Sequence, residues 1–114
     1  MTAPDLDAAA SAIDTADSVV RAAIAQLAGH GSVDDDQVLA YDLAHAASAV
    51  ATARSMLDYG AKGEIEGKLT CAFVADAIAD LAAKLFGREA QWGVEPGALD
   101  ATRDFVATYR EPEF

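Results

Sequence analysis

Between residues 36 and 86 the apolar residues recur at intervals of mostly three and four, in two runs separated by a short break. The first run is Leu39, Leu43, Ala46, Val50, Ala53 and Leu57, and the second is Ile65, Leu69, Phe73, Ile78, Leu81 and Leu85. This spacing is that of one face of an α-helix, whereas a β-strand alternates every second residue. Because residues 60–63 make only a short break, we predict an antiparallel helical hairpin whose apolar faces meet. Leu57 and Leu69 are expected in its core.

The first 28 residues follow a heptad pattern, with Leu6, Ile13, Val20 and Leu27 spaced seven apart and alanines between them. Such a pattern is typical of a helix that packs through a narrow, coiled-coil-like seam. We predict a helix over residues 4–28. Thr2 is its candidate N-cap, and Pro4 suits the first turn because its missing N–H would have no partner there.

Capping and turn residues give the remaining boundaries. Ser32 followed by Asp35 resembles a capping box and predicts a second helix over residues 33–59. A third helix is predicted over residues 64–91, although Gly87 either ends it or lies inside it, and a short fourth helix over residues 99–110 follows the turn sequence at 92–97. The sequence therefore predicts an all-α fold: three long helices in an up-down bundle with a short fourth C-terminal helix, in a single domain of residues 1–114.

Charge and cysteine content narrow the function classes. The chain has 8 Lys and Arg against 19 Asp and Glu, a net charge of −11. Nucleic-acid phosphates and anionic membrane surfaces would repel such a chain, so we expect neither as a partner. The acidity either keeps the domain in solution or docks a basic partner. A single cysteine, no signal-peptide pattern and no long apolar run favour a cytoplasmic protein that does not span a membrane.

Few residues have the arrangement that catalysis requires. Asp42 and His45 share one side of a helix, but a metal site would need further ligands from a facing helix. Asp76 and Asp80 would act as acids only if buried, and we expect them in a solvated stripe with Lys84. The acidic run at residues 34–36 lacks the alternating ligands of a calcium loop, and Cys71 is expected in the core. Without a phosphate-binding loop or a nucleophile motif, the chain itself is expected to have no catalytic, cofactor-binding or metal-binding residues.

Aromatic residues gather near the C-terminus, at Trp92, Phe105, Tyr109 and Phe114. A short fourth helix needs only one or two of them in a core. The four form a candidate interface, an apolar patch with charged residues around it, for a second copy of the chain or for the catalytic body of a longer protein. Trp92 either closes the end of the bundle or anchors a partner. The charged rim is expected to be Arg88, Glu95, Arg103 and Arg110.

Several strings of the sequence resemble a known family. They are the alanine-rich block at residues 41–54, Asp58-Tyr59-Gly60-Ala61-Lys62-Gly63-Glu64-Ile65-Glu66, Cys71-Ala72-Phe73-Val74-Ala75-Asp76 and Phe86-Gly87-Arg88-Glu89-Ala90-Gln91-Trp92-Gly93-Val94. Together they resemble the helical N-terminal extension that precedes the catalytic body in some bacterial acyl-CoA dehydrogenase-like flavoproteins, over residues 33–114. In that family the FAD, the acyl-CoA pocket and the catalytic glutamate belong to the main body, and none of their motifs can be placed in this chain.

The resemblance implies a non-catalytic helical accessory or docking domain, associated with a flavin-dependent acyl-CoA dehydrogenase-like oxidoreductase. It implies no cofactor in this chain and FAD in the parent protein. The alternative is a stand-alone acidic helical bundle that acts in self-association or in another protein–protein interaction.

Overall fold

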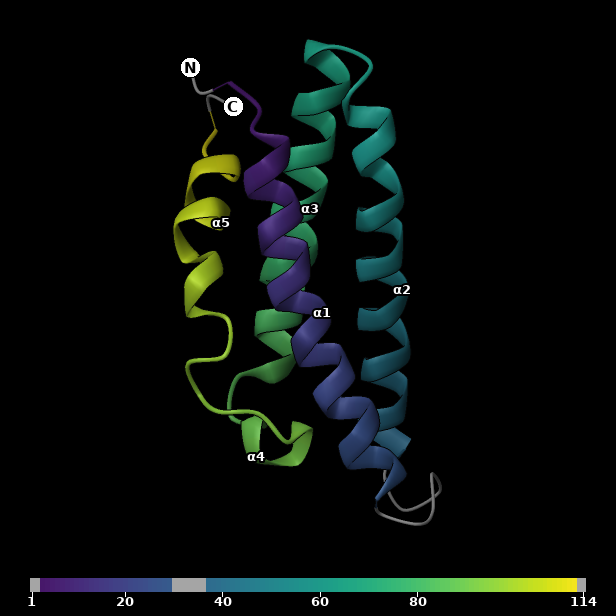
Figure 1. Ribbon diagram of the computed structural model, residues 1–114. Coiled ribbons are helices and arrows are strands. Elements are labelled where there is room, and N and C mark those ends of the chain that lie inside the picture. Colours follow the sequence, from purple (N-terminus) through teal and green to yellow (C-terminus); the bar gives the residue numbers. More distant parts are fainter. Residues whose placement is uncertain (1–2, 30–36, 113–114) are drawn as a thin grey trace.

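The computed structural model describes residues 3–29 and 37–112, and within these ranges it is helical and contains no strand. Three long helices, α1 (Leu6–Ala28), α2 (Gln37–Gly60) and α3 (Glu64–Leu85), pack together. The shorter elements are α4 (Glu89–Trp92), the 3-10 turn η2 (Asp100–Thr102) and α5 (Arg103–Tyr109). Figure 1 shows α1 and α3 running in one direction and α2 and α5 in the other. The predicted all-α bundle is confirmed.

The core lies between the three long helices, and small residues dominate the contribution of α1. Four of the seven buried residues of α1 are alanines, which let the neighbouring helices approach closely. Of the heptad positions, Ile13 and Val20 are buried and Leu6 and Leu27 are partly buried against the core. The larger core residues of the other two helices are Leu39, Leu43, Val74, Ile78, Leu81 and Leu85.

The first helix starts later than predicted. Asp5 is its N-cap, because its carboxylate accepts a hydrogen bond of 2.9 Å from the Ala8 N–H, and α1 begins at Leu6. Pro4 therefore precedes the helix instead of lying in its first turn. The predicted cap Thr2 and the predicted start of the second helix at residue 33 lie outside the described residues.

The predicted third helix over residues 64–91 is wrong beyond Leu85. Phe86 is extended, with φ −58° and ψ 119°, and Gly87 has a left-handed φ of +79°. Glycine adopts this conformation at no steric cost, so the helix ends there and the chain restarts as α4 at Glu89. The predicted fourth helix over residues 99–110 is divided into η2 and α5 and ends at Tyr109.

The apolar face predicted for α3 is also partly wrong. Ile65 and Leu69 are 71% and 51% exposed, whereas Ile78, Leu81 and Leu85 are buried as expected. At the start of α3 the core-facing positions are held by the small residues Gly67, Thr70 and Cys71. The helices cross too closely there for leucine or isoleucine, and the large side chains point to solvent.

This close crossing joins the end of α2, the start of α3 and the N-terminal segment. A Cβ atom on Gly60 would lie 2.7 Å from Thr70 Oγ1, and one on Gly67 would lie 3.0 Å from Pro4 Cγ. Thr70 is fully buried, and its hydroxyl lies 3.1 Å from the Met56 carbonyl oxygen of α2 and 2.9 Å from that of Glu66. The single hydroxyl proton of Thr70 is therefore satisfied within a glycine-lined contact.

Candidate functional site

The end of α3 exposes one large aromatic side chain, Phe86. Its backbone N–H still donates to the Ala82 carbonyl oxygen at 3.0 Å, but Gly87 then turns the chain away from the helix axis. As a result the Phe86 ring does not enter the core and is 85% exposed. It is the most exposed large apolar side chain among the described residues, which makes it a candidate contact point.

The C-terminal segment, residues 96–107, returns along α3 and forms the opposite wall of a groove. Phe105 and Tyr109 are buried with their ring centroids 4.7 Å apart, and the Tyr109 hydroxyl donates to the Ala3 carbonyl oxygen at 2.9 Å. On the outside, Arg110 Nε lies 3.0 Å from the Asp76 carboxylate of α3. These contacts hold α5 along α1 and α3.

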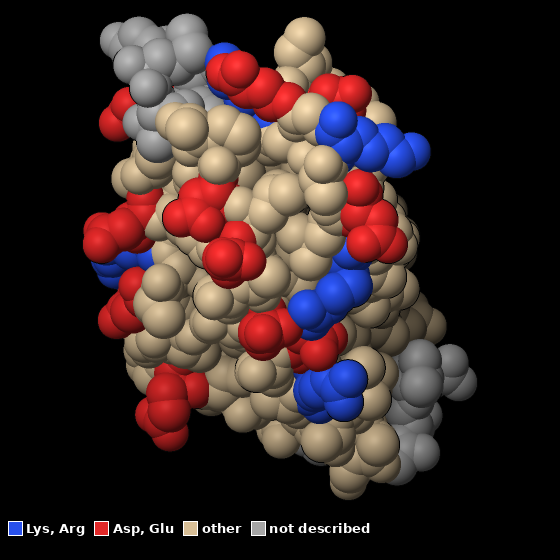
Figure 2. All heavy atoms as spheres, turned by 45° about the horizontal axis from the view of Figure 1, so that its top comes forward, with Lys and Arg blue, Asp and Glu red and all other residues tan. Residues whose placement is uncertain are grey.

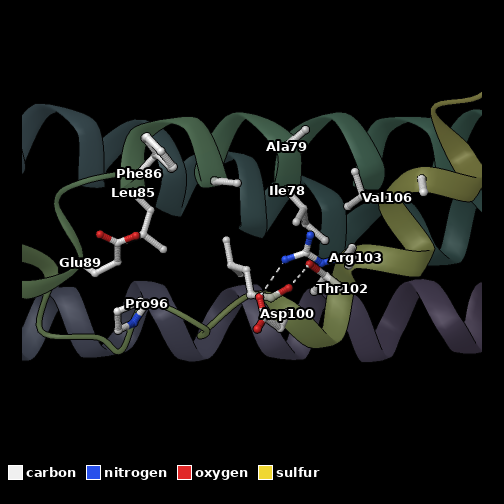
Figure 3. Close-up of a pocket in the computed structure, with 13 residues that line it drawn as sticks. Ile78, Ala79, Leu85, Phe86, Glu89, Pro96, Asp100, Thr102, Arg103 and Val106 are labelled. Atoms are coloured by element: carbon white, nitrogen blue, oxygen red, sulfur yellow. Dashed lines mark hydrogen bonds and ion pairs between the residues drawn. The ribbon is translucent and has the colours of Figure 1, made fainter.

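A groove of about 450 Å³ lies between α3 and this wall. Figure 3 shows Phe86 and Glu89 toward one end and Val106 toward the other, with Ile78 and Leu85 on the α3 side and Asp100 and Arg103 opposite. The residues that line the groove are Ile78, Ala79, Ala82, Leu85, Phe86, Glu89, Pro96, Leu99, Asp100, Thr102, Arg103, Val106 and Ala107. We call this the α3–α5 groove.

The charges of the α3–α5 groove are few. Asp100 and Arg103 pair with each other at 3.2 Å, both largely exposed. Glu89 forms no ion pair within the part of the chain that the structure describes. An apolar floor with a few charges at its edge is the pattern of a protein contact surface.

The aromatic residues expected at an interface lie instead in the core. Trp92, Phe105 and Tyr109 are all buried, and Phe114 lies outside the described residues. Trp92 closes the end of the bundle where α4 packs against α1, and its indole N–H has no hydrogen-bond partner in the described structure. The three described aromatics pack in the interior of the bundle and leave no exposed aromatic patch of their own.

Of the expected charged rim, only Arg103 lines the groove. Arg88 pairs with Asp42 of α2 at 3.2 Å, and Arg110 pairs with Asp76. On the face drawn in Figure 2, carboxylates outnumber basic groups, and most basic groups lie beside a carboxylate. On this face the acidic groups are spread out instead of gathered in one patch.

Sequence reasoning missed Phe86 and the groove. The available signal was Gly87 near the end of the apolar pattern, because glycine favours the left-handed conformation that ends a helix. The groove itself depends on contacts between segments distant in sequence, which no local pattern encodes.

The other candidate chemical groups lie in surface contacts or, for Cys71, in the core. Asp42 pairs with Arg88, and the exposed His45 ring lies 4.5 Å from that of Tyr41, measured between ring centroids. Asp80 pairs with Lys84, as the predicted solvated stripe requires. Cys71 is fully buried, and burial raises the pKa of its thiol, which favours the unreactive protonated form.

Residues 3–29 and 37–112 contain neither a metal-binding cluster nor a membrane-spanning helix. No cluster of three or more histidine, cysteine or carboxylate side chains suited to a metal ion occurs there, and the acidic run at residues 34–36 lies outside these ranges. None of the helices in these ranges has the length and apolar character that crossing a membrane requires.

The α3–α5 groove, with Phe86 at its edge, is thus the strongest candidate site. Comparison of the chain with protein-family models, with curated proteins and with solved structures gives no match.

Proposed function

We propose that this chain is a non-catalytic helical docking domain whose contact surface is the α3–α5 groove. The observation that carries the proposal is the 85% exposure of Phe86 beside an apolar recess. Moving such a side chain from water to an apolar environment contributes about 1.5–3 kcal/mol, which is available to a partner that covers it. Aromatic side chains beside a recess are also frequent energetic centres of protein interfaces.

The resemblance supports a particular enzyme class for the partner. The string from Phe86 to Val94 begins directly after α3, includes all of α4 and the start of the following loop, and contributes Phe86 and Glu89 to one end of the groove. We therefore propose that the domain is an accessory to a flavin-dependent acyl-CoA dehydrogenase-like oxidoreductase in the cytoplasm. In this proposal FAD and the catalytic glutamate belong to the main body of that enzyme, and this chain supplies neither.

A second candidate is a stand-alone acidic bundle that associates with itself or with an unrelated protein. The same groove favours it, because an apolar recess does not by itself specify an enzyme partner. The two candidates differ in whether a flavoprotein is found next to the groove.

Site-specific photo-crosslinking in the cells of origin tests the proposal. A photoreactive amino acid replaces Ala107, an exposed residue of the groove, and in the control it replaces Ala44, an exposed residue of α2 remote from it. Mass spectrometry should identify acyl-CoA dehydrogenase-like peptides, in the same or a separate polypeptide, only with the probe at Ala107. Phe86→Ser should reduce that product. Crosslinks from Ala107 that never include a flavoprotein would refute the association.

A further inference from the structure

We infer that the α3–α5 groove is occupied by a second copy of this chain, related by a two-fold axis, so that Phe86 of each copy enters the groove of the other. The inference rests on the proposed function in that the groove remains the docking surface, and the partner that docks there is the same domain of a second subunit, with any enzyme body that this subunit carries. In a longer protein the domain would then hold two subunits together.

The shape of the surface suits such a symmetric pair. A two-fold interface uses the same patch on both copies, so that patch must contain both a projection and a recess. Phe86 supplies the projection, and the groove directly beside it supplies the recess (Figure 3). An axis through the middle of the groove places Phe86 of one copy at the far end of the other, near Val106 and Ala107. Ala79 and Ala82 lie between, and their small side chains allow the two α3 helices to approach.

The charged residues at the two ends of the groove have opposite signs, so a two-fold axis brings unlike charges together. Glu89 lies at the Phe86 end, and Arg103 lies toward the Val106 end (Figure 3). The two-fold operation therefore brings Glu89 of each copy toward Arg103 of the other. Glu89 has no ion pair in the described structure, and Arg103, which uses one nitrogen for Asp100, retains donors for a second carboxylate. The pairing is repeated twice and fixes the relative orientation of the copies.

The net charge of the chain also favours contact through the α3–α5 groove. Two copies of a chain with net charge −11 repel each other over most of their surfaces. The lining of the groove carries only two carboxylates and one guanidinium, a net charge of −1. Two copies that meet through this face bring together few of the carboxylates that give the chain its charge. Because added salt screens the remaining repulsion, salt should strengthen this association, whereas it would weaken binding of a basic partner.

Sedimentation equilibrium of the purified chain tests the inference. The measurement is made at about 0.01 M and about 1 M sodium chloride, between which the Debye length falls from about 30 Å to about 3 Å. We expect a reversible dimer that is tighter at high salt. Phe86→Ser should weaken the association constant by about tenfold or more, given the apolar surface that the ring would bury. The matched control is Ile65→Ser, which removes an exposed apolar side chain at the other end of α3, outside the groove.

A charge exchange tests the predicted orientation. Glu89→Arg alone and Arg103→Glu alone should each weaken dimerisation, and the double variant should restore it; far-ultraviolet circular dichroism checks that each variant remains helical. A chain that is monomeric at both salt concentrations, a dimer insensitive to Phe86→Ser, or a double variant without recovery would each overturn the inference. If the chain is a monomer but its groove still crosslinks to a flavoprotein, the dimer inference fails and the proposed function stands. If the chain is a dimer but gives no such crosslink, the enzyme association fails and the dimer inference stands.

Discussion

Replacing Gly60 with alanine tests the close crossing of α2 and α3. The new methyl group would lie 2.7 Å from Thr70 Oγ1 and 3.0 Å from Leu6 Cδ2, and nonbonded carbon atoms do not approach so closely without a shift. Thr70 has little freedom to move, because it is fully buried and its hydroxyl is hydrogen-bonded to carbonyl oxygens of Met56 and Glu66. We therefore expect the helices to separate slightly and the fold to lose stability.

The expected magnitude follows from two opposing effects. Inserting a methyl group into a well-packed contact costs about 1–3 kcal/mol. Exchanging glycine for alanine in a helix contributes up to about 1 kcal/mol in the opposite direction, and less at the last helical residue, which Gly60 is. Packing outweighs propensity, so Gly60→Ala should lower the free energy of unfolding by about 1–2 kcal/mol.

Urea denaturation followed by far-ultraviolet circular dichroism measures the effect. The matched control is Gly29→Ala at the C-terminal end of α1, where the nearest atom to a new Cβ would be 3.5 Å away, an ordinary contact. That substitution should leave the stability unchanged or raise it by about 0.4–1 kcal/mol. Thr70→Ala should cost less in the Gly60→Ala background than in the wild type, since it removes the clashing atom. If Gly60→Ala is as stable as Gly29→Ala, the crossing is looser than described and the reasoning fails.

Three further predictions concern the core, the anchor of α5 and the cofactor. In urea denaturation, Leu39→Ala should cost about 2–5 kcal/mol, whereas Leu69→Ala, at a half-exposed position, should cost less than about 1 kcal/mol. Tyr109→Phe should cost about 0.5–1.5 kcal/mol through the lost bond to Ala3. Burial raises the pKa of Tyr109 above its value in the unfolded chain, which is about 10. The contribution of Tyr109 to the free energy of unfolding is therefore full below about pH 10 and is lost as the pH rises above that value. The difference in stability between the wild type and Tyr109→Phe should shrink in that pH range. The purified chain should show no flavin absorbance after desalting, and a yellow preparation would contradict the absence of FAD from this chain.

The positions of the long helices were predictable because they depend on local periodicity. The intervals of three and four in α2 identified Leu39, Leu43, Ala46 and Ala53, all of which are buried. The heptad of α1 was similarly informative, and its alanines indicated close packing. Period and propensity are properties of neighbouring residues, and both elements are long enough for the signal to accumulate.

The end of α3 and its buried face were not predictable in the same way. Residues 88–91 favour a helix locally, so their sequence does not indicate the break between α3 and α4. The left-handed Gly87 and the packing of Trp92 against α1 fix that break. Ile65 and Leu69 match a helical face, but α3 has neighbours on several sides, and its closest contact is made by Gly67 and Thr70. The groove then arises from the return of α5 along α3, a contact that a one-dimensional pattern does not contain.

The hydrogen bond from Tyr109 to Ala3 has a consequence for how the domain can be connected to other chains. It brings the two ends of the described fold together at one pole of the bundle, while α4 lies toward the opposite pole (Figure 1). A short peptide would therefore close the ends into a ring at a small cost in loop-closure entropy. The fold is thereby suited to circular permutation, with new ends opened near Lys62, and to insertion as a unit into a surface loop of a host protein.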